Sequence, residues 1–123
     1  MDGFDKKKEL AILRALFTES TEFMQAIGDA SRQLILLAIM QGEFGGSRIG
    51  EIARRIHLSE PTVTHHIRIL KDAGIVLCNR IGTKNYYYIN ADCDGFRKVK
   101  HLVTVYETVA DNFKAVQTYG DEE

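Results

Sequence analysis

A stripe of large apolar side chains at spacings of three and four residues predicts an N-terminal helix within residues 1–22. The stripe consists of Leu10, Leu13, Leu16 and Phe17. Residue types that commonly cap helices follow over Thr18–Glu22, so we expect a break in the helix there. A short second helix through Phe23 and Ile27 is then expected to end at Gly28.

Asp29 and Ser31 are candidates for the N-cap of the next helix. The apolar face of this helix is expected at Leu34, Leu37 and Ala38. Gly42 is expected to end it, and the glycine-rich stretch 42–47 predicts a flexible loop.

Two short helices separated by a tight turn are predicted over residues 49–73. The first carries apolar residues at helical spacing between Ile49 and Ile56, and Ser59 is the expected N-cap of the second. A helix turns by about 100° per residue, which places four residues of the second helix on one inward arc. These four are Val63, His66, Ile67 and Leu70. We interpret His66 as a hydrogen-bonded core histidine.

Residues 75–90 are rich in β-branched and aromatic types around Gly82, which predicts a β-hairpin. Helical spacing returns over residues 94–117. Its apolar stripe consists of Leu102, Val105, Tyr106, Val109 and Phe113. A short helix, a turn, a capped helix and a hairpin in this order are the plan of a winged helix-turn-helix. We therefore expect a mainly α fold with one small hairpin, forming a single domain over residues 1–123.

The size of the chain, 123 residues with 45% apolar residues, is consistent with one compact domain. No apolar run is long enough to span a membrane, and the charges within residues 1–8 do not fit a signal peptide. Two cysteines without CxxC spacing give neither a disulfide framework nor a zinc ribbon. These features predict a cytoplasmic protein without a membrane partner.

The charge of the chain is unevenly distributed. The net charge is -1, yet the segment 54–84 holds six cations and two anions, a local balance of +4 that leaves -5 for the rest. A basic segment within an acidic chain is typical of a protein that meets phosphate on one face.

The second helix of the 49–73 pair presents short hydrogen-bonding side chains on its outward arc, and a recognition helix reads bases with residues of this kind near its N-terminus. We expect Thr62, Thr64 and His65 to read bases, and Arg68, Arg80 and Lys84 to hold phosphates. The whole predicted DNA-binding set is Ser59, Glu60, Pro61, Thr62, Thr64, His65, Arg68, Arg80 and Lys84. Simpler readings stay open, since Ser59 is also a cap, Pro61 suits a first turn, and the rest could form a solvated face.

Three stretches of the chain, residues 26–32, 49–53 and 58–76, resemble the ArsR/SmtB family of winged helix-turn-helix repressors. The resemblance implies a homodimer built on the first and last helices, with two recognition helices in successive major grooves. It also implies a repressor that a ligand or chemical signal releases from DNA. The implied dimer interface comprises Leu10, Leu13, Phe17, Leu102, Val105, Tyr106 and Val109. Two-fold symmetry then predicts an inverted-repeat operator with half-sites about 34 Å apart.

The sequence departs from the family at its metal sites. Residues 46–50, where the resemblance places thiolates, contain no cysteine. Asp92 and Asp94 could form one ligand pair of the family's second metal site, at the start of the last helix, but carboxylates without imidazoles hold zinc poorly. We therefore predict no metal and no cofactor. Cys78 and Cys93 are a candidate redox pair, with the alternative that both are small apolar side chains.

The sequence is compatible with two functions. One is a sequence-specific repressor that binds double-stranded DNA, and the other is a winged-helix protein-interaction module without DNA binding. An enzyme is not expected, because the chain shows no nucleophile–base pair, phosphate loop or metal motif. No residue pattern identifies an inducer.

Overall fold

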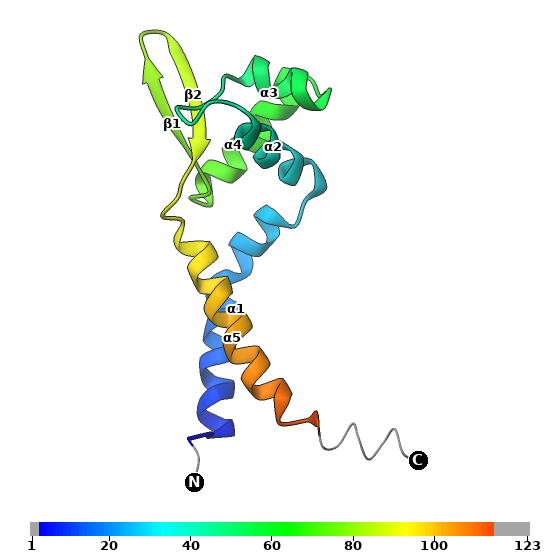
Figure 1. The fold of residues 1–123 in the computed structure, drawn as a ribbon, viewed down its shortest axis with the longest axis vertical. Helices are drawn as coiled ribbons and strands as arrows, with labels where there is room; N and C mark the ends of the chain where they lie inside the picture. The colour runs from blue at the N-terminus through cyan, green and yellow to red at the C-terminus, as the bar shows by residue number, and fades with distance from the viewer. Residues whose placement is uncertain (1–2, 115–123) are drawn as a thin grey trace. The chain divides into compact units, whose positions relative to one another are not determined.

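A computed structural model describes residues 3–114 of the chain. Its elements are α1 (Lys6–Ile27), α2 (Ala30–Gln41), α3 (Ile49–Ile56), α4 (Glu60–Asp72), β1 (Val76–Ile81), β2 (Lys84–Ile89) and α5 (Asp94–Asp111) (Figure 1). The expected mainly helical fold with one hairpin is confirmed. Within the described residues, no helix has the length and apolarity needed to cross a bilayer. The chain divides into two compact units, one formed by Glu22–Gly95 and the other by the segments outside it.

The unit Glu22–Gly95 buries an apolar core among α2, α3, α4 and the hairpin. The three helices contact one another, α4 packs on β1, and α2 and α3 pack on β2. The largest fully buried apolar side chains are Ile35, Ile52, Val63, Leu70, Ile75 and Val76, each 0–1% exposed. Burying a side chain of this size contributes about 1.5–3 kcal/mol, so this cluster is a main source of the unit's stability.

Helix α2 begins and ends as expected but buries a different face. The Asp29 carboxylate accepts a hydrogen bond from the Arg32 backbone N–H at 3.0 Å and caps the helix. The prediction that Leu34 and Leu37 face the core is wrong, since they are 49% and 56% exposed. The buried residues are Ile35, Ala38 and Ile39. The segment 34–40 is apolar all round, so its periodicity permits more than one arc, and contact with α3 and α4 selects one.

Helix α1 is continuous where the sequence predicts a break. The Thr18 hydroxyl donates to the Arg14 carbonyl at 3.0 Å, and the Thr21 hydroxyl donates to the Phe17 carbonyl at 2.8 Å. Both hydroxyls therefore bond carbonyls one turn back in the same helix instead of capping a new one. The helix ends at Ile27.

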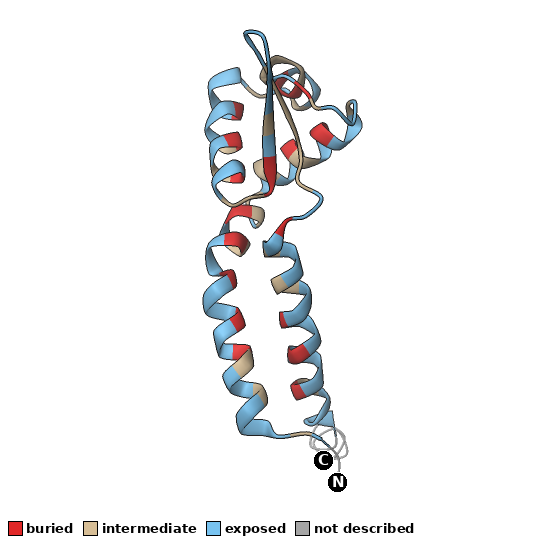
Figure 2. Cartoon of the chain, turned by 90° about the vertical axis from the view of Figure 1, so that its left-hand side faces the viewer, coloured by how far each residue is buried: buried red, intermediate tan, exposed pale blue. Residues whose placement is uncertain are grey.

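The second unit contains α5 from Phe96 onward and the part of α1 that precedes Glu22, which lie side by side in both views (Figures 1 and 2). Its buried apolar side chains are Leu13, Leu16, Leu102, Val105 and Val109. An ion pair joins Lys98 Nζ to Glu19 Oε1 at 3.5 Å. Helix α5 ends at Asp111, earlier than the sequence predicts, and residues 115–117 of the expected helix lie outside the described residues.

The predicted hairpin is confirmed. Strands β1 and β2 pair antiparallel with Ile81 opposite Lys84, so Gly82 and Thr83 form a two-residue turn. Gly82 has a φ of 63°, the left-handed conformation that a type II′ turn requires at its first central residue.

The loop between α2 and α3 is anchored at its end, whereas the sequence predicts a flexible loop. The backbones of Ser47 and Tyr87 exchange two hydrogen bonds of 2.9 and 2.8 Å, so the loop extends the hairpin. The buried Ser47 hydroxyl accepts from Arg55 Nη1 at 2.9 Å, and the same nitrogen donates to the Ala38 carbonyl at 3.1 Å. Arg55 therefore ties together α2, α3 and the loop, and its charge serves the fold.

We expect Gly42→Ala to destabilise this arrangement by about 1–3 kcal/mol. A Cβ at this position would press on the Ser47 hydroxyl and lie 3.0 Å from Arg55 Nη1. Gly45→Ala is the matched control, because nothing lies within 4 Å of a Cβ added there. Urea unfolding followed by circular dichroism compares the two variants, and equal midpoints would contradict the importance of the close contact at Gly42.

Candidate nucleic-acid interface

Helices α3 and α4 are joined by a tight turn over residues 57–59. His57 ends α3 in the left-handed conformation, with φ 57° and ψ 41°. The Ser59 hydroxyl accepts from the Thr62 backbone N–H at 3.3 Å, which confirms the expected N-cap of α4. Pro61 lies in the first turn, where the missing N–H leaves no helical hydrogen bond unmade.

Helix α4 has one buried face and one exposed face. Val63, Ile67 and Leu70 are 0–2% exposed, and His66 is half-buried beside them. The exposed residues at the start and on the outer face are Ser59, Glu60, Pro61, Thr62, Thr64, His65 and Arg68. The structure thus brings the predicted residues of this helix together on one surface, and their contact with DNA stays a prediction.

The hairpin of β1 and β2 is the wing of this fold, and the predicted phosphate-binding residues Arg80 and Lys84 are exposed near its turn. Arg80 Nε donates to the Gly82 carbonyl at 3.1 Å, which holds the Arg80 side chain against the turn. In the register of the strands, Arg80 lies opposite Asn85. The tip of the wing therefore carries two cations within a few residues of each other.

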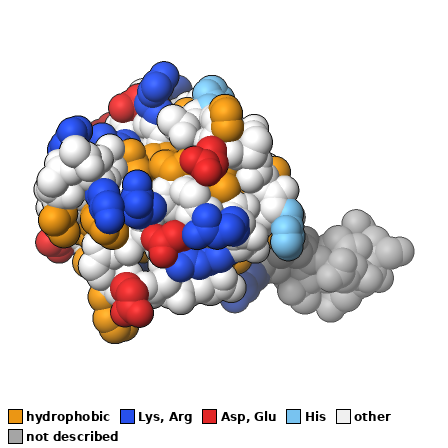
Figure 3. All heavy atoms as spheres, turned by 90° about the horizontal axis from the view of Figure 1, so that it is seen from above, with side chains coloured by type: hydrophobic (Ala, Val, Ile, Leu, Met, Phe, Trp, Pro, Cys, Tyr) orange, Lys and Arg blue, Asp and Glu red, His pale blue; other side chains and the backbone are white. Residues whose placement is uncertain are grey.

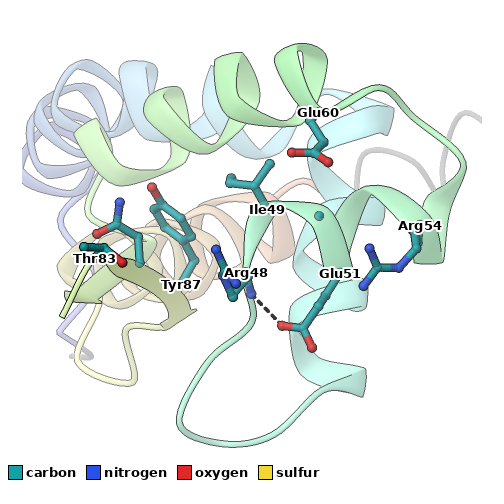
Figure 4. A pocket seen from close by; sticks show the side chains of 9 residues that line it. Arg48, Ile49, Glu51, Arg54, Glu60, Thr83 and Tyr87 are labelled. Atoms are coloured by element: carbon teal, nitrogen blue, oxygen red, sulfur yellow. Dashed lines mark hydrogen bonds between the residues drawn. The ribbon is translucent and has the colours of Figure 1, made fainter. Parts of the chain in front are cut away.

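A hollow of about 370 Å³ lies between the start of α3, the start of α4 and the wing (Figure 4). It is lined by Arg48, Ile49, Gly50, Glu51, Arg54, Glu60, Thr83, Asn85 and Tyr87. Glu51 Oε1 accepts from the Arg48 backbone N–H at 2.8 Å and so caps the start of α3. A Cβ on Gly50 would lie 3.4 Å from Arg54 Nη1 and 3.5 Å from Glu60 Oε2. The charged ends of Arg54 and Glu60 therefore both lie above the Gly50 backbone.

Arg48 and Arg54 are exposed residues of this surface that the predicted set omits. In the sequence, Arg54 is one of the cations of the basic segment 54–84, and no pattern distinguishes Arg48. Their position beside the wing depends on the packing of α3 against β2, which joins segments about thirty residues apart. Helical and strand periodicity, which involve only neighbouring residues, do not predict which elements so far apart in the chain pack together.

Tyr87 borders the hollow from β2. Burial raises the pKa of its phenol above the usual 10.0, and the neighbouring Cys78 thiol, its partner in the register of the strands, adds to the shift. The phenol is therefore neutral near pH 7, with an O–H able to donate a hydrogen bond.

Charge is mixed on the face of the molecule that Figure 3 shows. Figure 3 shows several groups of Lys and Arg side chains, separated by acidic and apolar ones. Binding of a polyanion to such a surface depends on where the individual cations lie, because no uniform positive field covers it.

Comparison with known proteins identifies the family. Residues 29–77 match the model of bacterial regulatory proteins of the arsR family. An HTH-type transcriptional regulator of Methanocaldococcus jannaschii is 34% identical over 87 residues, covering 71% of this chain and 90% of that protein. The chain belongs to the ArsR family.

Two further relatives agree with this assignment. A transcriptional repressor SmtB homolog of Synechocystis is 30% identical over 96 residues, covering 78% of this chain and 64% of the relative. A homodimeric winged helix-turn-helix DNA-binding domain from Mycobacterium bovis, described as a possible ArsR-family transcriptional regulator, superimposes with a TM-score of 0.55. That match has 27% identity and covers 100% of this chain and 93% of the domain. The winged helix-turn-helix fold of this ArsR-family regulator is thereby established.

The residues predicted for the ArsR-type dimer interface fall into two groups. Leu13, Leu102, Val105 and Val109 are buried within the unit of terminal helices. Leu10, Phe17 and Tyr106 are 40%, 43% and 54% exposed. The first group supplies the core of this unit in a single chain, and the second group remains available to a partner.

The candidate sensor sites of this ArsR-family chain are a metal site and a pair of cysteines. Among residues 3–114, no group of three or more His, Cys, Asp and Glu residues is placed to hold a metal ion. Cys78 is half-buried on β1 and Cys93 is buried, and both thiols are free. A redox role for them stays a prediction.

We expect Ser59→Ala to lower the free energy of unfolding by about 1 kcal/mol, because the first turn of α4 loses its side-chain acceptor. Ser59→Asp keeps an acceptor at the same position and is expected to retain most of the stability. Urea unfolding measures both variants. Equal destabilisation of the two would contradict the capping role of Ser59.

Proposed function

We propose that this ArsR-family protein is a dimeric transcriptional repressor that reads an inverted-repeat operator through α4. The observation that carries the proposal is the exposed start of α4, which presents short hydrogen-bonding side chains and borders one hollow together with the start of α3 and the wing. The SmtB homolog, a named repressor, and the M. bovis domain, named for DNA binding, support it.

Thr62, Thr64 and His65 are the proposed base-reading residues. They lie in the first two turns of α4 and are exposed, which suits a helix that enters the major groove with its N-terminal end. Hydroxyl groups both donate and accept hydrogen bonds, and a neutral imidazole does the same through its two nitrogens. Such groups can distinguish the donor and acceptor patterns of base edges in the major groove.

Five cations are proposed to hold phosphates around this helix: Arg48, Arg54, Arg68, Arg80 and Lys84. Arg68 follows the base-reading residues on α4, Arg80 and Lys84 lie at the wing, and the remaining two border the hollow. Ser59, Glu60 and Pro61 place the start of α4, whose free N–H groups also suit a phosphate. Glu60 is proposed to orient Arg54, because both side chains approach the same point above Gly50.

Dimerisation is proposed to occur through the terminal helices. Leu10, Phe17 and Tyr106 are exposed apolar residues of α1 and α5, and the M. bovis domain is homodimeric. Two copies related by two-fold symmetry would present two α4 helices to half-sites about 34 Å apart. The proposed place of action is cytoplasmic DNA, and neither a catalytic step nor a metal cofactor enters this function.

Mobility-shift titrations with fragments of the protein's own promoter region, at several salt concentrations, test the proposal. We expect tight binding to one fragment, and we expect the double variant Thr64→Ala, His65→Ala to lose its preference for that fragment. The physical reason is that these side chains contact base edges, which differ between sequences, whereas phosphates do not.

The cation variants give the second part of the same experiment. Replacing Arg54, Arg68 or Lys84 by Ala is expected to weaken binding to all fragments and to reduce the slope of log affinity against log salt by about 1. Lys7→Ala, an exposed cation near the start of α1, is the control and should leave the slope unchanged. Salt-independent binding, or equal affinity for every fragment, would favour the protein-interaction module instead.

A further inference from the structure

The Arg32 side chain joins the end of α1 to the recognition helix α4. Its Nε donates to the Ala26 carbonyl at 2.6 Å, and its Nη2 donates to the Gln25 carbonyl at 3.1 Å. These carbonyls belong to the last turn of α1, where the helix itself supplies no donors. The third contact is from Nη1 to Nδ1 of His66 on α4, at 3.2 Å.

The contact between Arg32 and His66 is sensitive to the protonation of the imidazole. A guanidinium carries only donors, so the contact is a hydrogen bond only when His66 Nδ1 accepts, which requires a neutral ring with its proton on Nε2. Protonation of His66 would place an N–H against an N–H and bring two positive charges together at 3.2 Å. The hydrogen bond from Arg32 to α4 exists only while His66 is neutral.

Several other charged or titratable groups surround this contact. At the start of α2, the Arg32 backbone N–H hydrogen-bonds the Asp29 carboxylate and lowers the pKa of that carboxyl below its usual 3.8, so Asp29 is anionic near pH 7. On α4, the His65 ring centroid lies 5.3 Å from that of His66. Glu22 of α1 and Asp72 of α4 line a hollow beside Arg32. The Asp29 carboxylate would attract a protonated His66. Its Oδ1 accepts the Arg32 backbone N–H, so this attraction acts beside the cap of α2.

We propose that Arg32 is a positioning residue for DNA recognition, and that its bond to His66 makes DNA affinity depend on a neutral His66. The proposal rests on the function proposed above, in which α4 reads the operator. His66 lies half-buried on the side of α4 away from Thr64, so its effect is on the placement of the helix and needs no contact with DNA. Acidification would then loosen α4 and weaken operator binding.

Two neighbouring histidines provide the test, because they are expected to act in opposite directions. Operator affinity is measured at pH 8.0 and pH 5.5, a range in which histidines titrate, for the wild type, His66→Gln and His65→Gln. The glutamine at position 66 can still accept from Arg32 through its amide oxygen but does not titrate. We expect the affinity of His66→Gln relative to the wild type to rise about tenfold on acidification, the effect of one lost hydrogen bond to a charged group.

His65 is the matched control. It is exposed on the face proposed to meet DNA, so its protonation adds a cation near phosphates. The affinity of His65→Gln relative to the wild type should therefore fall on acidification. An unchanged ratio of His66→Gln to wild type between the two pH values would overturn the proposal.

A stability measurement separates this inference from the proposed function. The free energy of unfolding of the wild type, relative to His66→Gln, should also fall between pH 8.0 and pH 5.5, with no DNA present. Arg32→Met should abolish that difference, because no cation then opposes the protonated ring. Absence of operator binding at pH 8.0 would overturn both proposals, whereas operator binding without any His66-dependent pH effect would overturn only this one.

Discussion

The burial of one side of α4 is the constraint on which the rest of the interface depends. Val63, Ile67 and Leu70 recur at spacings of three and four residues and are almost completely removed from water by α2, α3 and β1. With this side fixed, Thr64, His65 and Arg68 must point outward and form one exposed face. Rotating the helix to change that face would expose the apolar side chains, at about 1.5–3 kcal/mol each.

Local signals predict the elements that this constraint requires. Ser59 caps α4 as expected, Gly82 takes the left-handed conformation of the hairpin turn, and the inward arc of α4 is correct. Each of these features is decided within a few residues, by hydrogen bonding to nearby backbone, by backbone sterics or by helical periodicity. The family resemblance then implies a dimer and an operator geometry, which no single chain displays.

The errors arise where distant contacts decide between local alternatives. The segment 34–40 is apolar all round, so only packing reveals that Leu34 and Leu37 are exposed. Threonine is a common N-cap residue, yet the hydroxyls of Thr18 and Thr21 donate hydrogen bonds to carbonyls within α1. The role of Arg55 in joining α2, α3 and their loop and the position of Arg48 at the hollow likewise depend on contacts between separate elements. A basic residue in a sequence does not reveal whether its charge serves the fold or a partner.

Hydroxyl-radical footprinting of the purified protein on its own promoter region is the decisive experiment, because it records which DNA the protein covers and whether the covered sites are related by two-fold symmetry. For a dimeric repressor we expect two protected half-sites on an inverted repeat, with centres separated by about one helical turn, 34 Å. Uniform protection, or no protection at concentrations where the protein is folded, would contradict a sequence-specific dimeric repressor.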